Sequence, residues 1–156
     1  ITARFKSASR ENAVKFIVMV MSTPDTEESF EAPPELYEEM GRFNKRMIDA
    51  GVMLSGEGLH PSRNGARVLF DADRRTVVDG PFTESKELVA GYWILQCKDL
   101  EECVAWVKQT PNPMGTKSEI QIRQIMSPED FADLAPVEVL EHEERMREQL
   151  AEQQKA

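Results

Sequence analysis

The spacing of hydrophobic positions changes several times along the chain, and each change predicts an element. Residues 15–21 (KFIVMVM) form a nearly continuous apolar run, which is typical of a strand buried on both faces. Residues 34–50 repeat apolar side chains at helical spacing, which predicts a helix that begins with Pro34 and ends before Gly51. Its buried stripe consists of Leu36, Met40, Phe43 and Met47. The acidic, proline-punctuated residues 22–33 are predicted to form a loop over a pocket.

The middle of the chain alternates short apolar runs with turn residues, which predicts an antiparallel meander. Its strands are residues 52–59, 66–70 and 76–79. Asn64-Gly65, between the first two, is a strong hairpin signal because both residues tolerate positive φ. The next run, residues 88–97 (LVAGYWILQC), is the most apolar of the chain and predicts a central strand.

A second helix and a last strand complete the predicted domain. Asp99 is expected to cap a helix that stops before Pro111, and residues 118–126 alternate as in an edge strand. The buried face of that helix is predicted to hold Leu100, Cys103, Val104 and Val107. Helices segregated to one face of an antiparallel sheet give an α+β, ferredoxin-like two-layer sandwich, here with an extra β-hairpin and a C-terminal helical extension.

Charge and composition divide the chain into three segments and exclude some classes of protein. Residues 15–126 are predicted to be the α+β domain, and residues 1–14 an N-terminal extension that originates from cloning or from an upstream start. Residues 127–156 are predicted to be an acidic helical tail, with nine acidic and three basic residues. The net charge is −9, and the chain shows no basic stripe, so nucleic-acid binding is not expected. No apolar run is long enough to span a membrane or to form the core of a signal peptide, which predicts a cytoplasmic protein.

Two cysteines agree with a reducing compartment. Cys97 and Cys103 match neither a redox C-x-x-C pair nor a common zinc-ligand spacing, so two buried, reduced thiols are expected. The sequence contains no phosphate loop or nucleotide fingerprint, and no cofactor is predicted.

Candidate chemistry is concentrated in two stretches, GEGLHP at residues 56–61 and DGPF at residues 79–82. Histidine is the usual side chain for proton transfer near neutral pH, so His60 is a candidate, and a carboxylate such as Asp79 or Glu57 can orient its ring. The ends of two predicted meander strands bring these groups within reach of one another. The candidate catalytic residues are therefore His60, Asp79 and Glu57.

Each of these residues also has an ordinary structural explanation. The glycines around Glu57 are typical of a strand bend, His60 precedes a proline in a loop, and Asp79 suits an Asx-type turn before Gly80-Pro81. A metal site is not predicted, because Glu57 and His60 lie at i and i+3 on opposite faces of a regular strand.

The stretches GEGLHPS, DGPFTESKE, GYWIL and DLEECVAWV together resemble the YCII-related family, in particular its DGPF branch, from about Lys15 to Met126. The resemblance implies a ferredoxin-like domain of the dimeric α/β-barrel type, a homodimer, and a pocket between helices and sheet. It also implies a bacterial cytoplasmic protein, often associated with extracytoplasmic-function sigma factors. The His and Asp proposed to act in YCII-type relatives are absent, since residues 34–50 contain no His and residues 106–113 no Asp.

Two functions follow as expectations. The first is a small dimeric pocket protein that binds or transforms a small metabolite through the acid-base residues His60 and Asp79. The alternative is a non-catalytic dimeric regulatory module of a sigma-factor system, with the acidic tail binding a protein partner.

Overall fold

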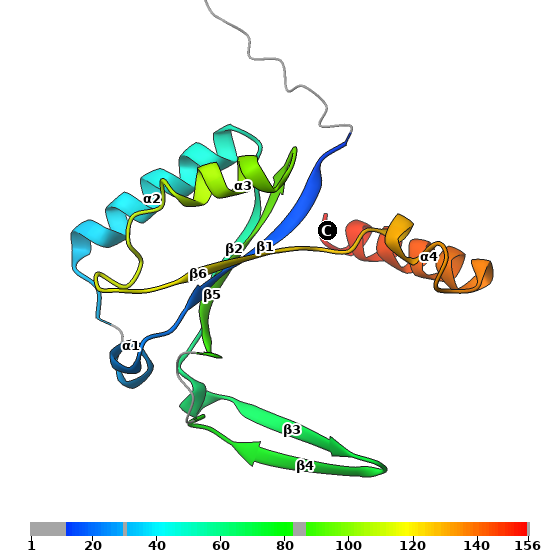
Figure 1. The fold of residues 1–156 in the computed structure, drawn as a ribbon, viewed down its shortest axis with the longest axis horizontal. Helices are drawn as coiled ribbons and strands as arrows, with labels where there is room; N and C mark the ends of the chain where they lie inside the picture. Colours follow the sequence, from blue (N-terminus) through cyan, green and yellow to red (C-terminus); the bar gives the residue numbers. More distant parts are fainter. Residues whose placement is uncertain (1–11, 30, 83–86, 156) are drawn as a thin grey trace, which may run out of the picture. The chain divides into compact units, whose positions relative to one another are not determined.

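The structure is a computed structural model, and it describes residues 12–29, 31–82 and 87–155. Most of the N-terminal extension and residues 83–86 of the DGPFTESKE stretch lie outside the described residues. The chain forms two compact units, Ile1–Gln124 and Ile125–Ala156. The first unit carries the sheets and the candidate site residues (Figure 1).

A four-stranded antiparallel sheet organises the first unit. Its strands are β1 (Val14–Met21), β2 (Met53–Gly58), β5 (Val89–Cys97) and β6 (Ile120–Gln124), in the order β2-β5-β1-β6. The two most apolar strands, β1 and β5, are central, because each buries side chains without exposing an unpaired edge. The predicted central and edge positions of residues 88–97 and 118–126 are thereby confirmed.

Helices α2 (Pro34–Asp49) and α3 (Leu100–Val107) cover one face of this sheet (Figure 1). Alternate residues of the central strands point at them and form the core with residues of α2 and α3. The buried members include Phe16, Val18, Leu95, Phe43, Met47 and Cys103. Gly51 ends α2 with a φ of 67°, the left-handed conformation expected at this position. The mixed α+β class is therefore confirmed.

The predicted meander is wrong in its pairing. β2 pairs with β5 and not with the next strand along the chain. Residues Ser62–Asn64 form a 3-10 turn, and Gly65 has a φ of −123°, so Asn64-Gly65 does not make the hairpin turn that its composition favours. Instead, β3 (Ala66–Asp71) and β4 (Arg74–Asp79) pair with each other as a separate two-stranded sheet.

Two further predictions are corrected by the helices. Residues 22–33 are not only loop, because Pro24–Glu28 form the short helix α1, capped by Thr23. In α3 the buried face holds Cys103, Trp106 and Val107, whereas Leu100 and Val104 are exposed. Helix α3 contacts β5 and β6, and Cys103, Trp106 and Val107 pack into the core there, so the predicted face is right for Cys103 and Val107 and wrong for Leu100 and Val104.

The opposite face of the four-stranded sheet has a different character. Strand alternation places Ile17 and Met19 of β1 and Tyr92 and Ile94 of β5 on it, and all four are partly exposed. No helix among the described residues of the first unit covers this face. The unit is therefore a two-layer structure whose sheet leaves one face open, with apolar side chains at the centre of that face and exposed polar ones, Lys15, Gln121 and Arg123, beside them.

Neither cysteine forms a disulfide and both are buried, as expected from the sequence. Burial raises the pKa of the Cys103 thiol, because the charged thiolate loses its hydration; a hydrogen bond with Cys97 partly opposes this shift. Both side chains therefore behave as small apolar groups of the core.

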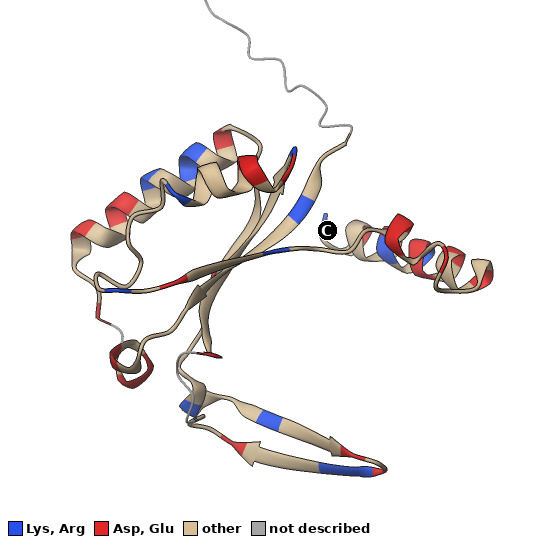
Figure 2. Cartoon of the chain, viewed as in Figure 1, with Lys and Arg blue, Asp and Glu red and all other residues tan. Residues whose placement is uncertain are grey.

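The second unit contains the 3-10 turn η3 (Pro128–Phe131) and helix α4 (Val137–Gln153). Ser127 and Asp130 cap η3 reciprocally. Acidic residues are spread along α4 (Figure 2), and Val137 and Leu150 are more than half exposed. None of the helices that the structure describes has both the length and the apolar character needed to cross a bilayer.

Candidate functional site

A pocket of about 330 Å³ opens between the helices and the β2–β5 edge of the sheet. Helix α1, the middle of α2 and the loop after β2 contribute to its wall. Apolar side chains dominate the lining, and its polar members include Glu27, Asn44, Glu57 and His60. A pocket with mostly apolar walls and a few polar groups is the usual form of a small-molecule site.

Glycines shape the floor of the pocket. A β-carbon on Gly56 would lie 2.6 Å from Trp93 Cδ1, and one on Gly91 would lie 3.0 Å from the carbonyl oxygen of Glu57. These two positions need glycine because side chain and backbone approach closely there. Gly58 differs, since its β-carbon would meet nothing within 4 Å although the residue lines the pocket. Close packing does not require glycine at position 58, and the absence of a side chain there leaves space in the pocket for a ligand.

Trp93 fixes the helix-facing wall. Its Nε1 donates to Asn44 Oδ1 at 3.0 Å, and its ring meets Phe43 edge-on with centroids 6.2 Å apart. Only 7% of Trp93 is exposed. The aromatic wall is therefore held in one orientation by α2, and it does not need a ligand to organise it.

The structure places two of the three predicted catalytic residues at this pocket. Glu57 and His60 both line it and are both exposed. The register pairs Glu57 with Tyr92 and Gly56 with Trp93, so Glu57 belongs to the strand face opposite to that of Trp93. Asp79 is the last residue of β4, paired with Ala66 and exposed, and it does not line this pocket.

His60 receives its side-chain hydrogen bond from a neighbour in the 3-10 turn. The side-chain amide nitrogen of Asn64 lies 3.3 Å from His60 Nδ1, within hydrogen-bond distance. Among the described residues no hydrogen bond joins His60 to Asp79 or to Glu57. The partnership of His60 with either carboxylate stays a prediction, and Asn64 is the residue that the sequence reasoning missed.

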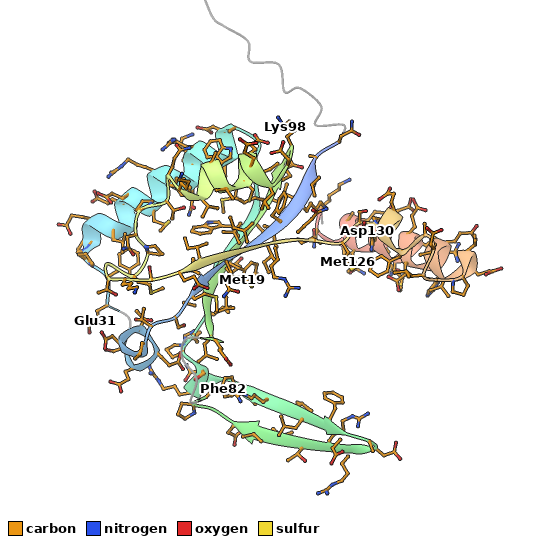
Figure 3. All side chains as sticks on the ribbon, in the orientation of Figure 1. Met19, Glu31, Phe82, Lys98, Met126 and Asp130 are labelled. Carbon is orange, nitrogen blue, oxygen red and sulfur yellow. The ribbon has the colours of Figure 1, made fainter. Side chains whose placement is uncertain are left out.

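The DGPF turn closes the base of the β3–β4 hairpin. The Gly80 N–H donates to the Gly65 carbonyl at 2.9 Å, and the Phe82 N–H donates to Ser62 Oγ at 2.8 Å. Figure 3 shows Phe82 at this base, and the guanidinium of Arg67 lies 4.1 Å from the centre of its ring. The peptide bond between Gly80 and Pro81 is cis. The motif thus has a complete structural role in the residues described.

Ser62 also connects the turn to α1. Its N–H donates to Glu27 Oε1 at 2.7 Å, and its hydroxyl donates to the same oxygen. Arg63 Nη1 donates to the Glu28 carbonyl at 2.7 Å. Glu27 is half-buried and lines the pocket, yet it lies in a stretch predicted to be loop. The missed signal was Thr23-Pro24, a cap residue followed by proline at the first helical position.

The described part of the chain contains no group of three or more His, Cys, Asp or Glu side chains placed to hold a metal ion. A second hollow of about 400 Å³ lies beside the pocket and shares Glu27 and His60 with it.

Comparison with known proteins gives one family and one relative. Residues 14–127 match the family model described as the YCII-related domain, which covers well over half of the chain. An uncharacterised protein of Rhizobium meliloti (strain 1021) is 23% identical over 97 residues, a match that spans 62% of this chain and 78% of the relative.

Proposed function

This chain belongs to the YCII-related family, and we propose that within that family it is a pocket protein that binds, and through His60 transforms, a small metabolite. The observation that carries the proposal is the pocket of about 330 Å³, whose wall is organised without a ligand and whose floor is left open at Gly58. Residues 79–82 support a place in the DGPF branch of the family.

Filling the pocket tests ligand binding. Gly58→Leu adds a side chain at a position where a β-carbon would meet nothing within 4 Å, so we expect the fold to be retained and fragment binding to weaken by about ten-fold or more. A fragment library is screened by NMR on the Trp93 indole N–H, which the Asn44 hydrogen bond places at the pocket wall.

Gly41→Ala is the matched control, since it also adds atoms where nothing lies within 4 Å, but on α2 and outside the pocket lining. Fragments should bind this variant as they bind the parent. If no fragment moves the Trp93 signal, or if Gly58→Leu binds the same fragments equally well, the pocket is not a ligand site.

His60 is the proposed proton-transfer group because it borders the pocket and its ring is hydrogen-bonded to Asn64. For a bound compound that the protein converts, we expect His60→Gln to lower kcat by roughly 10²–10⁴-fold while leaving affinity nearly unchanged. His142→Gln, on α4 in the second unit, is the control and should have no effect. An unchanged kcat in His60→Gln would remove His60 from the mechanism.

Further variants test which neighbouring residue orients the His60 ring. Asp79 and Glu57 keep their proposed role in orienting His60 only if Asp79→Asn or Glu57→Gln lowers kcat as well. Asn64→Ala tests the competing arrangement, in which the amide alone holds the ring. A loss confined to Asn64→Ala assigns the positioning role to Asn64.

We also propose that the chain forms a homodimer through the open face of its four-stranded sheet. The support is the cluster of partly exposed apolar side chains from β1 and β5 on that face. An apolar sheet face needs a second layer to exclude water, and a second copy of the chain supplies one of equal size.

A further inference from the structure

The charged side chains around the pocket are of one sign. Of the described residues that line it, Glu27 and Glu57 are acidic and none is Lys or Arg; the register places Glu57 on the strand face opposite to that of Trp93, so Glu27 is the carboxylate on the side of the helices. A cleft lined by one sign of charge raises the local concentration of ligands of the opposite sign and disfavours ligands of the same sign.

Glu27 is the better fixed of the two carboxylates. Its Oε1 accepts from the Ser62 N–H at 2.7 Å and from the Ser62 hydroxyl, and the residue is half-buried. Its Oε2 accepts no hydrogen bond from the described residues. Helix α1, which carries Glu27, is itself held by the reciprocal cap between Thr23 and Thr26. One oxygen is thus anchored and the other remains available to a ligand.

The guanidinium of the neighbouring Arg63 does not bind the Oε2 of Glu27. Arg63 Nη1 donates to the main-chain carbonyls of Glu28 at 2.7 Å and Glu27 at 3.4 Å, and Arg63 does not line the pocket. The guanidinium therefore stabilises the end of α1. The carboxylate keeps its preference for a positive partner inside the pocket.

The rest of the lining suits an organic body rather than a bare ion. Trp93 and Tyr37 line the pocket with aromatic rings, and Leu36, Met40 and Leu59 add aliphatic surface. The faces of aromatic rings attract cations, and aliphatic walls bind the carbon part of the same molecule. An alkyl- or arylammonium compound satisfies the carboxylate, the rings and the aliphatic wall together.

We propose that this pocket selects small organic ammonium compounds, with the ammonium group at Glu27 and the carbon body against Trp93 and the aliphatic wall. The inference rests on the proposed function, because it names the ligand class of the same pocket. It requires that a cation bind more tightly than a neutral or anionic molecule of the same shape.

Three probes of nearly equal shape test the charge preference at neutral pH: benzylamine as the cation, benzyl alcohol as the neutral molecule and benzoate as the anion. Titrations are followed on the Trp93 indole signal, with Trp106, which does not line the pocket, as the internal reference. We expect benzylamine to bind about ten-fold more tightly than benzyl alcohol, and benzoate to bind most weakly.

Glu27→Gln tests the anchor itself. Glutamine keeps an oxygen that accepts from Ser62 but removes the charge, so the preference for benzylamine should fall to about two-fold or less. Glu35→Gln removes an exposed carboxylate of α2 that does not line the pocket, and it should leave the preference intact.

The outcomes separate the two proposals. Equal or tighter binding of benzyl alcohol or benzoate at Trp93 overturns the ammonium preference and leaves the pocket as a ligand site. A benzylamine preference that survives Glu27→Gln overturns the role of Glu27. If none of the probes, nor any fragment of the library, reaches Trp93, the proposed function and this inference fail together.

Discussion

Replacing Gly80 with alanine is expected to destabilise the base of the β3–β4 hairpin by about 2–3 kcal/mol. A β-carbon at this position would overlap the carbonyl oxygen of Ser62 and would lie 2.5 Å from its carbonyl carbon. These neighbours are backbone atoms, so no side-chain rotation relieves the overlap. Ser62 cannot move away freely either, because it is hydrogen-bonded to Glu27 and to Phe82.

The expected readouts are a lower urea midpoint and faster hydrogen exchange of the β3 and β4 amides. Gly65→Ala is the matched control, because the Gly65 carbonyl accepts the hydrogen bond from the Gly80 N–H. Its β-carbon would stand 3.5 Å from the Ser62 oxygen, and its φ of −123° is open to any residue. We expect that control to change stability by less than about 1 kcal/mol. Equal behaviour of the two variants would contradict a steric requirement for glycine in the DGPF turn.

The elements of the four-stranded sheet were predictable because local periodicity determines them. The runs at residues 15–21 and 88–97 became β1 and β5, and the stripe of residues 34–50 became α2. Strand pairing was not predictable in the same way. β2 had two possible neighbours, the next strand in sequence and β5. The structure pairs Gly56 with Trp93 and Gly58 with Gly91, and periodicity does not encode such long-range pairing.

In the candidate site, too, residue types were predictable from the sequence, whereas their partners were not. His60 and Glu57 stood out as unusual residue types, and both border the pocket. Asp79 stood out for the same reason, yet its hairpin position follows from the pairing of β3 with β4, which the predicted meander lacked. Asn64 was read as part of a hairpin turn and Glu27 as part of a loop, and only the folded chain shows that they hydrogen-bond to His60 and Ser62. The regulatory role of the acidic tail and the cytoplasmic location stay predictions.

Adjacent residues of β1 are expected to respond in opposite ways to an introduced aspartate. Val18 is fully buried among the core residues under α2 and α3, and Ile17 lies on the open face, opposite Ile94 and Arg123. Val18→Asp places an unpaired carboxylate in the core, which costs roughly 4–5 kcal/mol or more and should leave the chain unfolded. Circular dichroism and denaturant titration measure that loss.

Ile17→Asp is expected to retain the fold but to convert the proposed homodimer into monomers, because a charge on the open face opposes its burial against a second copy. Sedimentation equilibrium over a range of concentrations measures the change in mass. Leu100→Asp makes the same apolar-to-acidic change at an exposed position of α3, on the helix side of the sheet, and should leave the mass unchanged. A dimer that survives Ile17→Asp would place the interface elsewhere, and unfolding of Ile17→Asp would mean that this face is already buried within a single chain.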